Sequence, residues 1–284
     1  MGSGAFLVEA CRQLGDELVK AWHVHRALPP IPPDEDELLH ARRLVAQRCL
    51  YGVDKNPMAV DLAKLSLWLA TLAKDHPFTF FDHSLRCGDS LVGLTREQIV
   101  AFHWKPGAQR VLKEDRIKNR IDRAIECRRA ILESADSISY PLLQQKLALA
   151  DEALELVRFA GDAVIATFFS GEKDREREQK RDEFLEQFFN WFESGSPDIA
   201  KPIEDSIEQL KTGSKPITPF HWHIEFPEVF ERSQSGFDVI VGNPPFAGKN
   251  SLLNSNRDGY LDWLKTIHEE SHGNAILARY RPKS

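Results

Sequence analysis

The residues best suited to chemistry lie in one short stretch near the end of the sequence. A β-branched run, Val239-Ile240-Val241, predicts a buried strand that stops at Gly242. The tetrapeptide Asn243-Pro244-Pro245-Phe246 follows directly. Because prolines fix φ and carry no backbone donor, the carbonyls of this turn are left as acceptors, and the Asn243 side chain adds another. The stretch therefore predicts a rigid cluster of acceptors beside a flat ring, which suits an amino group on a planar base.

Three earlier stretches could hold a ligand. Gly2 and Gly4 precede an amphipathic helix, where glycines allow close backbone approach and free amides favour an anion. Asp54 ends a short strand, where an acid can bind ribose hydroxyls, and Asn56-Pro57 follows it. Asp89 follows a short apolar segment and could accept a hydrogen bond from an adenine amino group. Taken singly, these features are equally consistent with a terminal Gly-Ser stretch, a helix-starting acid and a turn aspartate.

Taken together, these stretches occur in an order that resembles the motifs of a known family. The chain resembles adenine-N6-specific DNA methyltransferases of the restriction–modification type, in the large single-chain or modification-subunit branch. Gly2–Leu7 matches the second half of the family's first motif, Tyr51–Pro57 matches the second motif and Arg86–Leu91 matches the third. Phe220–Phe230 resembles the segment before the catalytic motif, and Asn243–Phe246 matches the catalytic tetrapeptide.

The resemblance implies S-adenosylmethionine as cofactor. Gly2 and Gly4 would line its methionine portion, and Asp54 would bind its ribose. Asn56 and Pro57 would flank its adenine ring, whose amino group would bind to Asp89.

The resemblance also implies roles at the catalytic motif. The side-chain oxygen of Asn243 and the carbonyl of Pro244 would accept hydrogen bonds from the two N–H groups of an adenine N6. Pro245 completes the motif, and Phe246 would stack on a base flipped out of double-stranded DNA.

Other functions fit some of the same residues. A dinucleotide site needs a third small residue in its glycine loop, and this chain has Leu7 there. An amino-directed RNA or protein-glutamine methyltransferase would use the same acceptor cluster. An inactive fragment or scaffold, binding a partner through a helical insertion, is the non-enzymatic alternative.

Composition narrows the class of protein. The 284 residues are 42% hydrophobic, which is enough for a core. The net charge of −6 counts against a self-sufficient DNA-binding protein. Four widely spaced cysteines without a Cys-x-x-Cys pair predict reduced thiols in a cytoplasmic protein and no zinc. No apolar run predicts a membrane span, and His221 and His223 are expected to pack rather than bind a metal.

Hydrophobic spacing predicts the elements that position these residues. A first helix is expected over residues 5–22. A second should begin at the acidic residues 34–37 and continue to about Arg48, and a third should span residues 57–72. The last of these should have one broad apolar face, formed by Val60, Ala63, Leu67, Leu62, Leu65 and Leu69. Short strands are expected at residues 50–54, around 87–91 and again over 220–230, and residues 251–284 should be mostly helical.

Residues 95–213 are predicted to form a large helical insertion. A 4-3-4-3 spacing predicts a helical hairpin or coiled-coil seam through Leu143, Leu147, Ala150, Leu154, Val157, Gly161, Val164 and Phe168. Because acidic residues are interleaved with its arginines, a solvated face is favoured over DNA contact for Arg116, Arg120, Arg123, Arg128 and Arg129.

The predicted fold class is α/β, with a partial Rossmann-like class I methyltransferase sheet that lacks its first strand. The predicted domains are a cofactor-binding part (1–94), the helical insertion (95–213) and a part with the catalytic motif (214–284). Since the first motif begins at its middle, we expect a fragment with weak or no independent activity. Its partners would be missing portions of the same enzyme or a specificity subunit.

Overall fold

The computed structural model describes residues 1–31, 35–72, 79–134, 138–242 and 254–267. The chain divides into two compact units. Of the described residues, the first unit takes those within 1–88, 125–151 and 239–242, and the second takes those within 89–124, 152–238 and 254–267.

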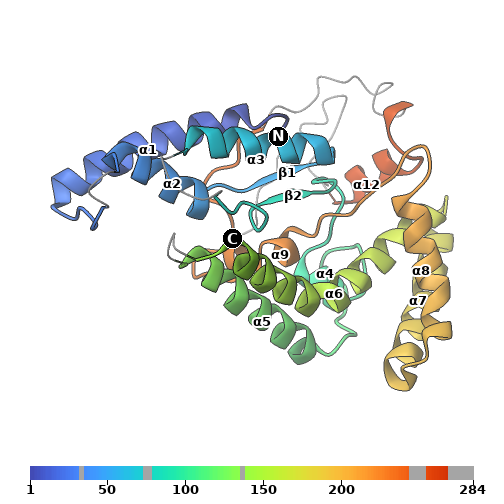
Figure 1. Ribbon diagram of the computed structural model, residues 1–284. Coiled ribbons are helices and arrows are strands. Elements are labelled where there is room, and N and C mark those ends of the chain that lie inside the picture. The colour runs from blue at the N-terminus through green and yellow to red at the C-terminus, as the bar shows by residue number, and fades with distance from the viewer. Residues whose placement is uncertain (32–34, 73–78, 135–137, 243–253, 268–284) are drawn as a thin grey trace. The chain divides into compact units, whose positions relative to one another are not determined.

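The first unit is built around a small parallel sheet. Strand β1 (Gly52–Asp54) pairs with β2 (Leu85–Cys87) in the register Gly52↔Leu85, Val53↔Arg86 and Asp54↔Cys87. Helix α3 (Pro57–Ala70) connects the two strands, so β1, α3 and β2 form one βαβ unit. Helices α1 (Ala5–His25) and α2 (Glu37–Arg48) lie side by side, and α1 also packs on α3 (Figure 1).

Local sequence explains where these helices begin. The side chain of Asn56 accepts a hydrogen bond from the Met58 amide at 3.0 Å, and Pro57 occupies the first turn of α3. The side chain of Asp36 caps α2 in the same way, through the Leu39 amide at 3.0 Å. All three helices expected in this region are confirmed.

The expected apolar face of α3 is only half correct. Val60, Ala63 and Leu67 are buried, with exposed fractions of 4% or less. Leu62, Leu65 and Leu69 lie on the opposite side of the helix and are 46%, 47% and 57% exposed. A helix packed against a core buries one stripe of its surface, and the second row of leucines falls outside that stripe.

The described part of the segment predicted as a helical insertion consists mainly of helices, joined by irregular stretches such as residues 101–113. It contains α4 (Arg96–Val100), α5 (Glu114–Leu132), α6 (Tyr140–Ser170), α7 (Asp174–Ser194) and α8 (Pro197–Lys211). All eight residues of the predicted seam are buried along α6. The boundary between the two units passes through α5 and α6. The three-part division at residues 94 and 213 stays a prediction.

The prediction of a strand over residues 220–230 is wrong. Two short helices, α9 (Trp222–Glu225) and α10 (Pro227–Phe230), occupy this stretch. Its burial does not alternate, since every residue from Ile224 to Phe230 is buried, and Pro227 suits the start of a helix. A short helix, α12 (Tyr260–Ile267), follows near the end of the described chain.

The predicted buried strand at Val239-Ile240-Val241 is also wrong. These residues are irregular in structure and 76%, 50% and 65% exposed. A strand needs a neighbour for its backbone groups, and in the described part of the chain the sheet consists of β1 and β2. Over its described residues the fold is therefore a mostly helical α/β structure with a two-stranded parallel sheet, smaller than the partial Rossmann-like sheet expected.

Candidate functional site

The glycine segment and the strand-end acid meet in the first unit, as their predicted roles require. The backbone amide of Gly2 donates to Asp54 Oδ2 at 2.8 Å, across 52 residues of sequence. The Met1 ammonium group lies 2.8 Å from the same oxygen. The Asn56 amide donates to Asp54 Oδ1 at 2.9 Å, so the carboxylate also fixes the turn into α3.

Gly4 is required at the start of α1 for two reasons. It has φ of +82°, in the left-handed region that side chains rarely adopt. A Cβ at this position would also lie 3.0 Å from both Cα and Cβ of Ala63. The glycine therefore lets the N-terminal segment approach α3 closely.

The environment of Asp54 favours its charged form. Partial burial would raise the pKa of this carboxyl, but hydrogen bonds from the N-terminal ammonium and the Asn56 and Gly2 amides outweigh burial and lower its pKa. The side chain keeps 18% exposure. Because a carboxylate has about four acceptor positions, Asp54 retains capacity for a further donor such as a ribose hydroxyl.

Asp89 lies in the second unit, where it already has a side-chain partner. The Tyr260 hydroxyl donates to the Asp89 carboxylate, 3.0 Å from Oδ1 and 3.1 Å from Oδ2, and Asp89 is only 4% exposed. Burial and the neighbouring Asp89 charge raise the pKa of Tyr260, so the phenol stays protonated. Sequence reasoning missed Tyr260, which is separated from Asp89 by 171 residues and belongs to no recognisable motif.

The backbone beside Asp89 is held by several contacts. The Asp89 amide donates to the Thr218 carbonyl at 2.8 Å. The indole N–H groups of Trp222 and Trp263 donate to the carbonyls of Ser90 and Leu91, each at 2.9 Å. These contacts fix the loop of the predicted third motif within the second unit.

The predicted catalytic residues Asn243, Pro244, Pro245 and Phe246 lie outside the described residues. The described chain reaches Gly242, directly before the motif. The six predicted cofactor residues Gly2, Gly4, Asp54, Asn56, Pro57 and Asp89 are all described.

The two histidines before the catalytic motif make packing contacts, as expected. His221 is buried, its Nδ1 accepts from the Leu94 amide at 3.0 Å, and its Nε2 lies 3.1 Å from Asp162 Oδ1. The amide fixes the tautomer, so Nε2 donates to Asp162. The His223 ring stacks on Phe230, with centroids 4.3 Å apart.

Metal ligands, membrane-spanning helices and cysteine pairing bear on other kinds of site. Among the described residues, no group of three or more histidine, cysteine or acidic side chains is placed to hold a metal ion. No helix in the described ranges is both long and apolar enough to cross a membrane. All four cysteines are free thiols.

Comparison with known proteins identifies relatives. The sequence model of the family described as Eco57I restriction-modification methylase matches residues 48–276. The chain is 23% identical to a Methanocaldococcus jannaschii protein that bears the name of a type II restriction enzyme and methyltransferase. The alignment covers 87% of this chain and 21% of that protein, so the chain spans about a fifth of its relative's length. No solved structure matches the chain.

Proposed function

The chain belongs to the Eco57I restriction-modification methylase family, and from this premise we propose that it transfers a methyl group from S-adenosylmethionine to adenine N6 in DNA. The observation that carries the proposal is the meeting of Gly2, Asp54 and Asn56 in the first unit. A glycine segment, a strand-end carboxylate and a capped helix start together suit the binding of a nucleoside with a charged tail.

The residues of the first unit fit the cofactor. Asp54 has remaining acceptor capacity for one further donor such as a ribose hydroxyl, and Gly2 has open space where a side chain would otherwise lie. When bound, S-adenosylmethionine supplies an electrophilic methyl group. The unit formed by β1, α3 and β2 has the βαβ arrangement from which Rossmann-like sheets are built. In such sheets, ligands bind beyond the carboxyl ends of the strands.

The proposed role of Asp89 in cofactor binding has to allow for the Tyr260 hydroxyl, which already donates to its carboxylate. Its two oxygens face the Tyr260 hydroxyl, so an adenine amino group would have to bind beside that phenol or displace it. Asp89 in this proposal orients the adenine ring, and Tyr260 holds the carboxylate in position.

Catalysis is assigned to Asn243, Pro244 and Phe246 from the chemistry of their motif. The N6 lone pair of adenine is delocalised into the ring and is a poor nucleophile. The Asn243 side-chain oxygen and the Pro244 carbonyl would accept hydrogen bonds from the two N–H groups, and this would favour a pyramidal nitrogen. Each such hydrogen bond to a developing charge contributes roughly 1.5–3 kcal/mol. Phe246 would stack on the flipped base.

Cofactor binding is the first test, measured by titration calorimetry with S-adenosylmethionine. We expect binding by the chain, weakened about tenfold or more by Asp54→Ala, because a hydrogen bond to a charged group contributes roughly 1.5–3 kcal/mol. Glu9→Ala, an exposed acid on α1, serves as the control and should leave the affinity unchanged. Folded protein that does not bind the cofactor would contradict the proposal.

Methyl transfer is the second arm of the same test. Labelled cofactor is incubated with unmethylated duplex DNA, and the product nucleosides are separated. We expect a low yield of N6-methyladenine, in line with the weak independent activity predicted from the sequence, and loss of that product with Asn243→Ala. Incorporation into RNA or protein alone, or incorporation that does not depend on Asn243, would contradict adenine-N6 transfer.

A further inference from the structure

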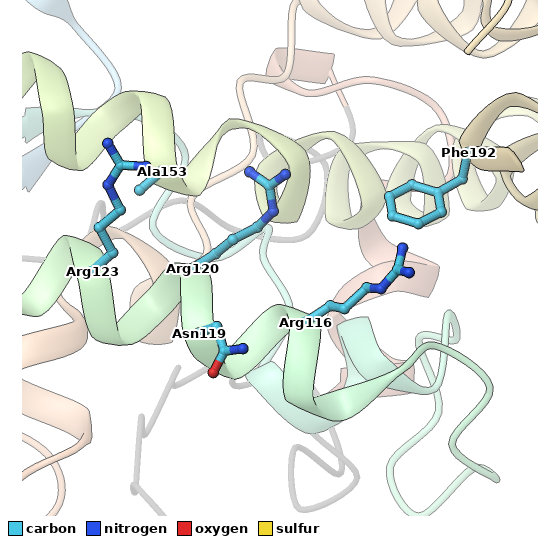
Figure 2. Close-up of a pocket in the computed structure, with 6 residues that line it drawn as sticks. All are labelled: Arg116, Asn119, Arg120, Arg123, Ala153 and Phe192. Carbon is cyan, nitrogen blue, oxygen red and sulfur yellow. The ribbon is translucent and has the colours of Figure 1, made fainter. Parts of the chain in front are cut away.

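A hollow on the second unit is lined by three arginines and one aromatic ring. Its volume is about 430 Å³, and its lining residues come from three helices: Arg116, Asn119, Arg120 and Arg123 from α5, Ala153 from α6 and Phe192 from α7. Figure 2 shows the three arginine side chains extending from α5 toward α6, with Phe192 facing Arg116. The hollow contains none of the residues assigned to cofactor or base.

The three arginines form one stripe along α5. They are spaced at i, i+4 and i+7, which places them on one side of a helix. Within the described residues, none of the three has a carboxylate within ion-pair distance, whereas other arginines such as Arg86 and Arg158 form ion pairs with Asp151 and Glu225. The stripe is therefore a local concentration of uncompensated positive charge on a chain of net charge −6.

The helix separates charges that are interleaved in the sequence. Asp115, Asp122 and Glu126 fall roughly 100° around α5 from the arginine stripe, at 100° per residue. Arg128, another arginine of the same helix, is buried and donates to the His83 carbonyl at 2.7 Å. Arg116, Arg123 and Arg129 are exposed, as the expected solvated face requires, Arg120 is partly exposed, and Arg128 alone of the five is buried.

Phe192 adds orientation to this charge. The Arg116 guanidinium lies over the Phe192 ring, 4.8 Å from its centroid, and the ring is 37% exposed. A cation–π contact restrains Arg116 without consuming its N–H donors. Asn119 places a neutral donor beside the stripe, of the kind that commonly contacts phosphates.

We propose that this hollow binds the sugar-phosphate backbone of duplex DNA. Arg116 and Arg123 are seven residues apart, so the stripe extends about 10 Å along α5, which matches about three nucleotide steps of one strand. Planar guanidinium groups suit phosphate oxygens. The choice of DNA over another polyanion rests on the proposed function. The arrangement positions the duplex and reads no sequence.

The experiment compares two triple variants that remove equal charge. Arg116→Gln, Arg120→Gln and Arg123→Gln are combined in one chain. Lys118→Gln, Arg129→Gln and Arg175→Gln, all at exposed positions, are combined in the control. Each triple lowers the net charge by three, from −6 to −9. Binding to a fluorescent duplex is measured by anisotropy across a salt series, without cofactor, after circular dichroism has shown that both variants fold.

The hollow triple should weaken DNA binding by about tenfold or more at low salt and reduce the salt slope by about 3, one for each phosphate contact. The control triple should keep most of the DNA affinity and most of the salt slope. Equal losses in the two triples, no loss in the hollow triple, or arginine-dependent binding of single-stranded RNA without duplex binding would overturn the proposal. Arginine-dependent DNA binding without any methyl transfer would uphold it while the proposed function fails.

Discussion

At the scale of single residues, Asp54 connects the folding of the first unit to its proposed chemistry. Its carboxylate receives the Met1 ammonium and two backbone amides, from Gly2 and Asn56. The same oxygens are those proposed to bind ribose. The residue therefore has a structural role that exists without any ligand, and mutations there change stability as well as affinity.

The lowered pKa of Asp54 predicts a pH-dependent contribution to stability. A carboxyl whose pKa is lower in the folded than in the unfolded chain stabilises the fold above its ordinary pKa. This stabilisation disappears as the pH falls through the lowered, folded-state pKa. We expect wild type to exceed Asp54→Asn in unfolding free energy at pH 7, and the difference to shrink steadily below about pH 4.

Urea denaturation from pH 7 to pH 3 measures this difference. Asp61→Asn, an exposed acid on the neighbouring helix α3, provides a matched control that should stay close to wild type. A difference for Asp54→Asn that is independent of pH would show that its carboxylate charge is not what stabilises the turn.

At the scale of elements, α3 shows how the core selects one side of an apolar helix. Its two rows of aliphatic side chains are nearly equal in the sequence, yet Leu67 is fully buried and Leu65, two residues away, is 47% exposed. Leu67 belongs to the core that also contains Cys11, Val45 and Leu85. The difference arises from packing, since both residues have the same intrinsic preferences.

The two leucines make a matched pair of variants. Leu67→Ala should lower the unfolding free energy by about 2–5 kcal/mol, because it removes buried methyl groups and leaves a cavity. Leu65→Ala should change it by roughly 0.5 kcal/mol or less, because half of that side chain is already in water. Chemical denaturation of both variants gives the comparison, and similar losses would show that the outer row is also buried in solution.

At the scale of the whole molecule, the division into two units does not follow the order of the chain. Helices α5 and α6 each contribute residues to both units, and α6 alone is 31 residues long. Backbone hydrogen bonds run continuously through such a helix. The two units therefore share elements whose loss would affect both.

Shared helices predict that the units unfold together. We expect amides in α3 and amides in α8 to exchange with the same free energy of opening as urea increases. Leu147 is buried in α6, and Leu147→Ala should lower the free energy of opening of the α3 amides and of the α8 amides by the same amount. Hydrogen exchange followed by mass spectrometry provides the measurement. If α8 opens at lower urea than α3, or if Leu147→Ala affects only one of them, the units are independent.

Much of the helical structure was predictable because its signals are local. The Asn56-Pro57 start of α3 and the buried seam of α6 follow from capping and periodicity over a few turns. Strand predictions were less successful, because a strand depends on a partner elsewhere. Val239–Val241 has strand-like residues but is exposed and irregular, and residues 220–230 bury an aromatic cluster as short helices.

The sequence by itself determined the family, the local helices and the order of the candidate motifs, because each depends on residues close together in the chain. Only the tertiary structure decided which groups meet: Gly2 with Asp54, Tyr260 with Asp89, and Arg116 with Phe192. It also decided which row of α3 is buried. These outcomes depend on contacts between distant segments, which no local pattern encodes.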